Sequence, residues 1–202
     1  MKSIHWLFIL PLAFFVAGGA EAGTYSLRIR YQPVKEFPGL QQKVGATLAI
    51  APVKDERKDT LYIGSHARFQ GDSTYFRSYP SLETAIQDSL SNVFSRYGVK
   101  TISIPSWDGL PDSLKNMEAD SVLMIEIKRF WTDGKGAPFR TNVRTVVQMV
   151  IHLGVKKEGK VFTRNVESEK EMTVSRSTPE RVEAMINQML TEIFDTYFSN
   201  PY

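Results

Sequence analysis

Alternating apolar and polar residues predict strands early in this chain. Between positions 25 and 31, Leu27 and Ile29 alternate with arginines, which is the period of a half-buried strand. The apolar run over 47–53 predicts a short strand that is buried on both faces. The stretch over 61–79 is rich in glycine, serine and aromatic residues, and it fits either a loop or a loop that contains a short hairpin.

A second group of strands is predicted in the later half. Residues 99–104 form a short strand, and 121–131 a strand whose apolar residues on both faces favour a central place in a sheet. We expect a turn at 133–136. Alternate apolar residues then predict a long amphipathic strand over 142–156, joined through a hairpin connection to a polar partner over 161–174. These strands are expected to form an antiparallel meander.

Apolar residues spaced three and four apart predict two amphipathic helices. The first covers 82–97, with Ser81 as its N-cap and Gly98 at the left-handed position after its end. The second begins after Thr178, with Pro179 at its first position, and continues to Tyr197. A short helix is also predicted over 111–117.

These elements predict an α+β fold. Two helices, each with one apolar stripe, suit a two-layer sandwich in which both cover one face of a mainly antiparallel sheet, and the other face is left open. Residues 23–202 are long enough for a single domain of this kind. The strand over 142–156 is a candidate for edge-to-edge pairing with a second copy or with a partner's strand.

The first 22 residues predict a secretory signal peptide. Lys2 precedes an apolar run from Ile4 to Ala17, and small residues follow at the positions where cleavage before Gly23 requires them. The sequence Val16-Ala17-Gly18-Gly19 also resembles a bacterial lipobox, with glycine in place of the obligatory cysteine. Descent from a lipoprotein and a chance likeness both remain open. We expect a periplasmic or secreted protein, with outer-membrane association as an alternative.

The absence of cysteine restricts the chemistry of the chain. It excludes disulfides, thiolate catalysis and zinc sites built on cysteine, and a lipid anchor cannot be attached to the sequence as written. The net charge of +3 is mild, and the basic residues are dispersed. This charge fits an ordinary solvated surface, and attraction to anionic lipid headgroups is the alternative. Nucleic acid is not expected as a partner in the compartment that the leader predicts.

No catalytic, cofactor or metal-binding motif is recognisable. His66 and His152 follow the leader without the spacing of a nucleophile and its base or of a metal site, and a hydrolase that uses His66 is the weakest hypothesis. The charged loop around Asp55 and Asp59 lacks the pattern of a calcium loop and is better interpreted as a salt-bridge network. We therefore expect a non-enzymatic protein without cofactors.

Charged and aromatic residues near loops are the candidates for contact with a partner. Large aromatic side chains in such places are enriched at protein interfaces. The candidate interaction surface consists of Asp55, Arg57, Asp59, Tyr62, Trp107 and Trp131.

Three segments carry a resemblance to a known family. The chain resembles the YajG-type uncharacterised bacterial lipoproteins. The resemblance lies in the lipoprotein-like leader and in three segments: TLAIAPVKDERKDTLYIG over 47–64, the helix SLETAIQDSLSNVFSRYG over 81–98, and the capped final helix. The chain is more distantly similar to auxiliary lipoproteins of envelope ABC transport systems. The resemblance implies an envelope protein without catalytic residues, and the missing cysteine departs from the family.

Two hypotheses for function follow. The first is binding of another envelope component, a protein or a lipid, through a sheet face, a loop or a sheet edge. The alternative is a periplasmic carrier of an apolar ligand between sheet and helices, where Met149, Met185 and Met189 would line an adaptable cavity. The oligomeric state is left open by the sequence.

Overall fold

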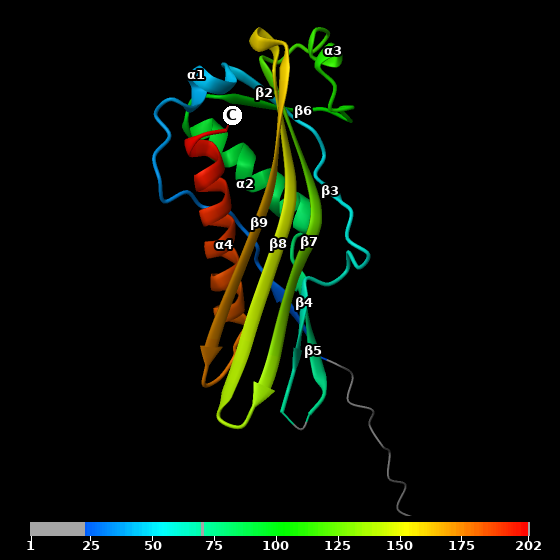
Figure 1. Cartoon of the computed structure of the whole chain (residues 1–202), viewed down its shortest axis with the longest axis vertical. Coiled ribbons are helices and arrows are strands. Elements are labelled where there is room, and N and C mark those ends of the chain that lie inside the picture. The colour runs from blue at the N-terminus through cyan, green and yellow to red at the C-terminus, as the bar shows by residue number, and fades with distance from the viewer. Residues whose placement is uncertain (1–22, 70, 202) are drawn as a thin grey trace, which may run out of the picture.

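Three long antiparallel strands are the central feature of the fold (Figure 1). The computed structural model describes residues 23–69 and 71–201. The strands β7 (Ser121–Ala137), β8 (Arg140–Val155) and β9 (Lys160–Val174) form a meander, and the 3-10 turn η1 (Lys156–Glu158) joins the last two. The meander confirms the pattern that the alternation of residues predicts.

The other edge of β7 pairs with three short strands in succession. All three, β2 (Thr47–Ile50), β3 (Lys54–Asp55) and β4 (Gly64–Ala67), run parallel to β7. The remaining strands are β6 (Lys100–Ser103), parallel to β2; β5 (Ser73–Ser78), antiparallel to β4; and β1 (Thr24–Leu27), parallel to β5. The sheet is therefore partly parallel, although its long ladders are antiparallel. The β4–β5 hairpin settles the ambiguous stretch over 61–79.

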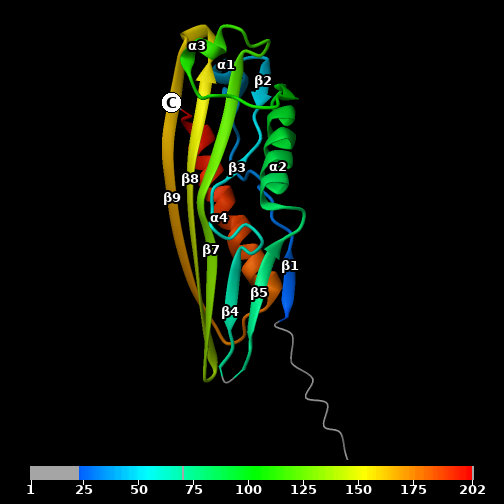
Figure 2. The same cartoon turned by 90° about the vertical axis from the view of Figure 1, so that its right-hand side faces the viewer.

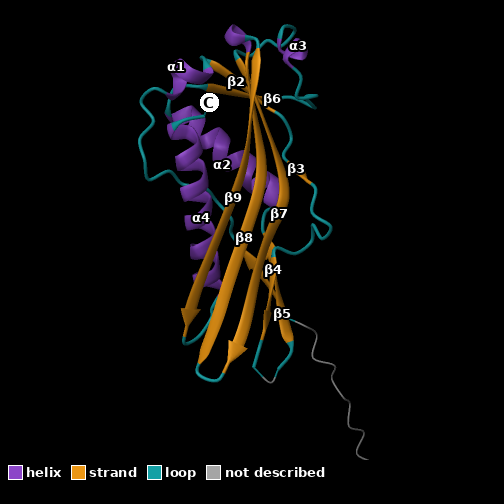
Figure 3. Ribbon diagram, in the orientation of Figure 1, coloured by secondary structure: helices purple, strands orange, loops and turns teal. Residues whose placement is uncertain are grey.

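Two helices cover one face of this sheet (Figures 2 and 3). Apolar residues of α2 (Leu82–Arg96) and α4 (Pro179–Ser199) share one core with alternate residues of β7 and β8. Phe94 and Phe194 are fully buried there, as are Ile151 and Leu190. The α+β sandwich is confirmed.

The helix ends follow local sequence signals. Ser81 Oγ accepts a hydrogen bond from the backbone N–H of Thr84, as expected of an N-cap residue. Gly98 has φ +74°, the left-handed conformation that glycine adopts without strain. Thr178 occupies the N-cap position of α4, but its side chain makes no capping hydrogen bond.

One end of the opposite face is covered as well, which the sequence pattern does not predict. The helix α3 (Pro111–Leu114) and the loop before it place Trp107 and Leu114 in one cluster with Ala49 of β2 and with Val122 and Met124 of β7. Gly154 permits this approach, because a Cβ there would lie 2.5 Å from Leu114 Cδ2. The short helix α1 (Leu40–Val44) is also absent from the sequence prediction.

The turn predicted at 133–136 is wrong, because β7 continues through it to Ala137. The glycines in this stretch make room for the neighbouring hairpin. A Cβ on Gly134 would lie 2.7 Å from His66 Cδ2, and one on Gly136 would lie 2.6 Å from the backbone nitrogen of Phe69. Small residues that permit a close approach of strands were mistaken for turn residues.

The strand predicted over 25–31 is shorter in the structure and ends at Leu27. The next residues are not part of a strand, because their backbone amides bond to side chains of the helices. The N–H of Arg28 donates to Glu183 at 2.8 Å, and the N–H of Arg30 donates to Asn187 at 2.9 Å. The alternating burial that predicted a strand therefore arises from packing against α4.

The predicted leader, residues 1–22, lies outside the described residues, and the single domain over 23–202 stays a prediction. None of the helices in the described part of the chain has the length and hydropathy needed to span a membrane.

Candidate interaction surface

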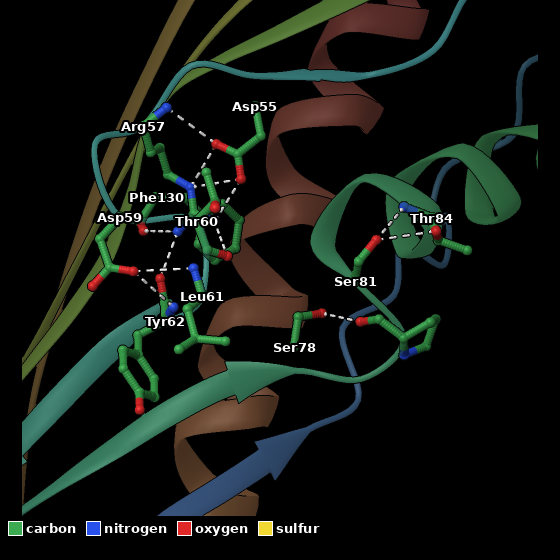
Figure 4. Close-up of polar contacts among 11 residues, drawn as sticks. Asp55, Arg57, Asp59, Thr60, Leu61, Tyr62, Ser78, Ser81, Thr84 and Phe130 are labelled. Atoms are coloured by element: carbon green, nitrogen blue, oxygen red, sulfur yellow. Dashed lines mark hydrogen bonds and ion pairs between the residues drawn. The ribbon is translucent and has the colours of Figure 1, made fainter.

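The loop between β3 and β4 is held against β7 by a buried ion pair (Figure 4). Arg57 Nη2 lies 2.6 Å from Asp55 Oδ2, and the two side chains are only 5% and 3% exposed. Arg57 also donates to the backbone carbonyls of Tyr62 and Phe130, at 2.7 and 3.2 Å. Within the loop that the sequence analysis interprets as a salt-bridge network, this pair points inward and joins the loop to the central strand.

Asp59 and Tyr62 lie at the outside of this loop. Asp59 Oδ1 accepts hydrogen bonds from the backbone N–H groups of Leu61 and Tyr62, which fixes the turn into β4 (Figure 4). The Tyr62 ring packs on the Tyr75 ring of β5, with centroids 4.7 Å apart.

The two predicted tryptophans lie in different environments. Trp107 is 4% exposed beneath α3, where its Nε1 donates to Ser113 Oγ at 2.8 Å. Trp131 is half-buried in β7, and its Nε1 donates to Asp133 Oδ1 at 2.9 Å. The structure therefore brings the loop residues Asp55, Arg57, Asp59 and Tyr62 together beside β7 and places Trp107 in a separate cluster. An interaction role for the six residues stays a prediction.

The side chains of β7, β8 and β9 that point away from α2 and α4 form what we call the open face. Cross-strand polar pairs dominate it. Arg144 makes two hydrogen bonds to the Glu169 carboxylate, at 2.6 and 2.7 Å, and Gln148 donates to Glu167 at 2.9 Å. The hydrogen bond from Arg144 lowers the pKa of Glu169. His152 bonds to Thr163 on this face, consistent with the less apolar side expected for it.

The outer edge of β9 is the longest free strand edge in the described part of the chain. β9 pairs with β8 alone. Among the described residues, no group outside β8 forms a hydrogen bond with the β9 backbone from Thr163 to Val174. The prediction that the strand over 142–156 offers an edge is wrong, since β8 lies between β7 and β9 and both of its edges are paired. Alternation of apolar and polar residues cannot distinguish an interior strand from an edge strand.

A cavity of about 610 Å³ lies where α4 begins. Tyr25, His66, Arg68 and Arg176 line it together with the first residues of α4. His66 Nε2 is buried and makes no hydrogen bond to a described residue. Desolvation by burial, with a contribution from the Arg68 charge, lowers the pKa of His66 below its ordinary value of 6.5.

The lowered pKa of His66 predicts a loss of stability in mild acid. The neutral imidazole is favoured in the folded state, so its contribution is complete above pH 6.5 and is lost as the pH falls through the lower folded pKa. We expect the free energy of unfolding, measured with urea, to fall between about pH 7.5 and 5.5, and to fall less in His66→Gln. Equal slopes for His66→Gln and the unmodified protein would contradict the prediction.

The methionines expected to line a carrier cavity are packed in the main core. Met149, Met185 and Met189 are 1%, 5% and 0% exposed. Among the described residues, no group of three or more histidine or acidic side chains is arranged to hold a metal ion. The three methionines therefore belong to the core between the sheet and the helices.

Comparison with solved structures finds proteins of the same architecture. The crystal structure of XCC0632 from Xanthomonas campestris, a DUF330 protein, matches with TM-score 0.57 and 18% identity, over 88% of this chain and 93% of that chain. The chain shares the fold of XCC0632. At this identity the likeness extends to the fold alone.

Weaker matches include an uncharacterized protein and a lipoprotein. The former has TM-score 0.47 and 9% identity, over 87% of this chain and 99% of that chain. Lipoprotein GNA1162 from Neisseria meningitidis has TM-score 0.35 and 13% identity, over 74% of this chain and 99% of that chain. Neither TM-score supports an argument about this protein. No family model and no curated protein matches the chain.

Proposed function

We propose that this chain is a non-enzymatic protein of the bacterial cell envelope that binds another envelope protein by adding a strand to the outer edge of β9. The observation that carries the proposal is the free backbone of β9 from Thr163 to Val174, a length of about 40 Å. An edge strand presents unpaired N–H and C=O groups along its length, and these can pair with an incoming strand.

The side chains beside this edge indicate the partner's chemistry. Glu167, Glu169 and Glu171 alternate along β9 on the open face, and Glu169 and Glu171 are 43% and 69% exposed although Arg144 lies near both. An incoming strand with Lys or Arg at alternate positions would pair with these carboxylates. A second copy of β9 would bring glutamates close to glutamates, and the like charges oppose that pairing.

The proposed location rests on the leader and on the resemblance to YajG-type lipoproteins. A cleaved signal peptide delivers the chain to the periplasm or the medium, and the sequence as written has no cysteine to receive a lipid. The lack of a recognisable catalytic motif supports a binding role. The alternative of an apolar carrier has less support, because the three methionines that it invokes are core residues.

Site-specific photo-crosslinking in a Gram-negative host tests the proposal. A benzophenone amino acid at Asn165, exposed on β9, should give an adduct with an envelope protein, whereas the same group at Asn92, exposed on α2, should not. Glu167→Lys combined with Glu171→Lys should reduce the yield at Asn165 by about tenfold or more, because basic residues then face a basic partner. Asp88→Lys combined with Glu118→Lys is the matched control and should leave the yield unchanged.

Three results would contradict the proposal. One is the absence of any adduct at Asn165, and another is the same adduct from Asn165 and Asn92. The third is an adduct with the mass of two copies of this chain, which would make β9 a self-association surface.

A further inference from the structure

Two hairpins and the start of α4 lie together at one end of the molecule, the lower end in Figures 1 and 2. Residues 68–69 and 71–72 lie between β4 and β5, and Pro138 and Phe139 join β7 to β8. The parallel pairing of Ala67 with Lys135 holds the two hairpins side by side. We call this end the tip, defined by residues 68–69, 71–72, 135–140 and 175–176.

The tip carries two large apolar side chains that the fold does not bury. Phe69 is 53% exposed and Phe139 is 97% exposed. Phe139 also has φ +65°, a conformation that glycine and asparagine adopt more readily than an aromatic residue. Packing within the domain therefore gives no reason for phenylalanine at this position. Two exposed aromatic rings on adjacent hairpin loops suit contact with an apolar phase outside the protein.

Positive charge surrounds these two rings. Arg68, Lys135, Arg140 and Arg176 are all exposed at the tip, and Asp72 is the one carboxylate in the residues that define it. None of the ion pairs between described residues includes any of these four cations. Their charge is thus free to attract an anionic surface.

The chain reaches the domain at the same end. Thr24, the first residue of β1, pairs with Tyr75 near the start of β5, and the Tyr75 N–H donates to the Gly23 carbonyl. Gly23, the residue that follows the predicted leader, therefore lies at the tip end of the domain.

We infer that the tip docks on an anionic phospholipid surface, with Phe69 and Phe139 inserted at the headgroup level and the four cations against the phosphates. Aromatic rings combined with lysines and arginines favour the interface of anionic bilayers. None of the residues that define the tip belongs to β9, so the inference does not depend on the proposed strand addition. With the tip on the membrane, β9 would extend from the membrane surface toward the opposite end of the domain.

Vesicle sedimentation tests the inference with protein expressed from the full chain and purified from the periplasm, its starting residue established by intact mass. We expect binding to vesicles of phosphatidylglycerol and phosphatidylethanolamine, weakened by salt, and little binding to phosphatidylcholine alone. Phe69→Ser with Phe139→Ser should weaken the partition coefficient by about tenfold or more, since each ring loses its apolar burial. Arg68→Glu with Arg140→Glu should weaken it similarly.

Matched controls are available at the other end of the molecule. Leu110→Ser removes an apolar side chain that is 57% exposed near α3, and Lys100→Glu reverses an exposed charge on β6. Both should bind like the unmodified protein, and so should Glu167→Lys, far along β9 from the tip, which separates this test from that of the proposed function. Absence of binding to anionic vesicles would overturn the inference. Binding that survives the double phenylalanine substitution would also overturn it.

Insertion can be measured directly with a reporter at the tip. Phe139→Trp should gain tryptophan fluorescence that brominated phosphatidylglycerol quenches, beyond the quenching seen in the unmodified protein. Leu110→Trp should also gain tryptophan fluorescence, but the brominated lipid should not quench it. Equal quenching at both positions, or none at Phe139→Trp, would show that the tip does not enter the bilayer.

Discussion

Replacing Arg57 with alanine is expected to lower the free energy of unfolding by about 3–5 kcal/mol. The substitution leaves the Asp55 carboxylate 3% exposed without its cation, and it removes the donor that the carbonyls of Tyr62 and Phe130 share. A buried charge without a partner costs far more than a surface ion pair gains. Urea unfolding at neutral pH measures the change.

Arg144→Ala is the matched control for Arg57. Arg144 also bonds a glutamate through two nitrogens, but its side chain is 51% exposed and water can replace the lost contacts. We expect a loss of about 1 kcal/mol or less. Similar losses for the two variants would mean that burial of the Arg57 pair contributes nothing of its own.

Gly64→Ala should lower the free energy of unfolding by about 3 kcal/mol, near the upper end for overpacked sites. A Cβ at Gly64 would lie 2.3 Å from the backbone oxygen of Thr132 and 2.8 Å from its Cβ. Both atoms belong to the neighbouring strand β7, so the contact is relieved only if β4 separates from it. Urea unfolding again measures the loss.

Gly39→Ala tests whether this loss is specific to the close contact. A Cβ at Gly39 would meet no atom within 4 Å, and its φ of −95° is accessible to alanine. Because glycine is a better N-cap residue than alanine, we expect a loss of about 1 kcal/mol or less. If Gly64→Ala were as mild as Gly39→Ala, β4 would not be held tightly against β7.

Arg57 and Gly64 matter because they align β4 with the central strand. Arg57 joins the loop before β4 to β7, and Gly64 permits the two strands to approach. The same alignment carries Phe69 to its place beside the β7–β8 hairpin. Loss of either residue should therefore disturb the tip as well as lower stability.

The sequence alone predicted the elements whose signals are local. Ser81 and Gly98 bound α2, and the spacing of apolar residues from Val182 to Tyr197 indicates α4, because a helix buries one stripe whatever lies opposite it. The long alternation in β8, followed by a polar partner, was enough to predict the meander. The α+β class follows from these elements together.

The candidate site was predictable only in part. The charged loop around Asp55 is visible in the sequence, but the inward orientation of Arg57 depends on carbonyls of Tyr62 and Phe130, and Phe130 is distant in the chain. Phe69 and Phe139 were missed, since an aromatic residue in a loop looks the same whether it packs or stays exposed. The proline before Phe139 and the glycine after Gln70 are the only local signals of the two hairpin loops.

The tertiary structure decided how the strands are ordered and which surfaces remain free. The alternation of apolar and polar residues indicates that one face of a strand is buried. It does not indicate which strand pairs with it or in which direction, because the backbone groups that pair are the same in every sequence. Three features depend on which strands become neighbours. They are the parallel pairing of β2, β3 and β4 with β7, the placement of glycines 134 and 136 inside a strand, and the free edge of β9. The tip exists for the same reason, because the pairing of β4 with β7 brings together loops that are far apart in the sequence.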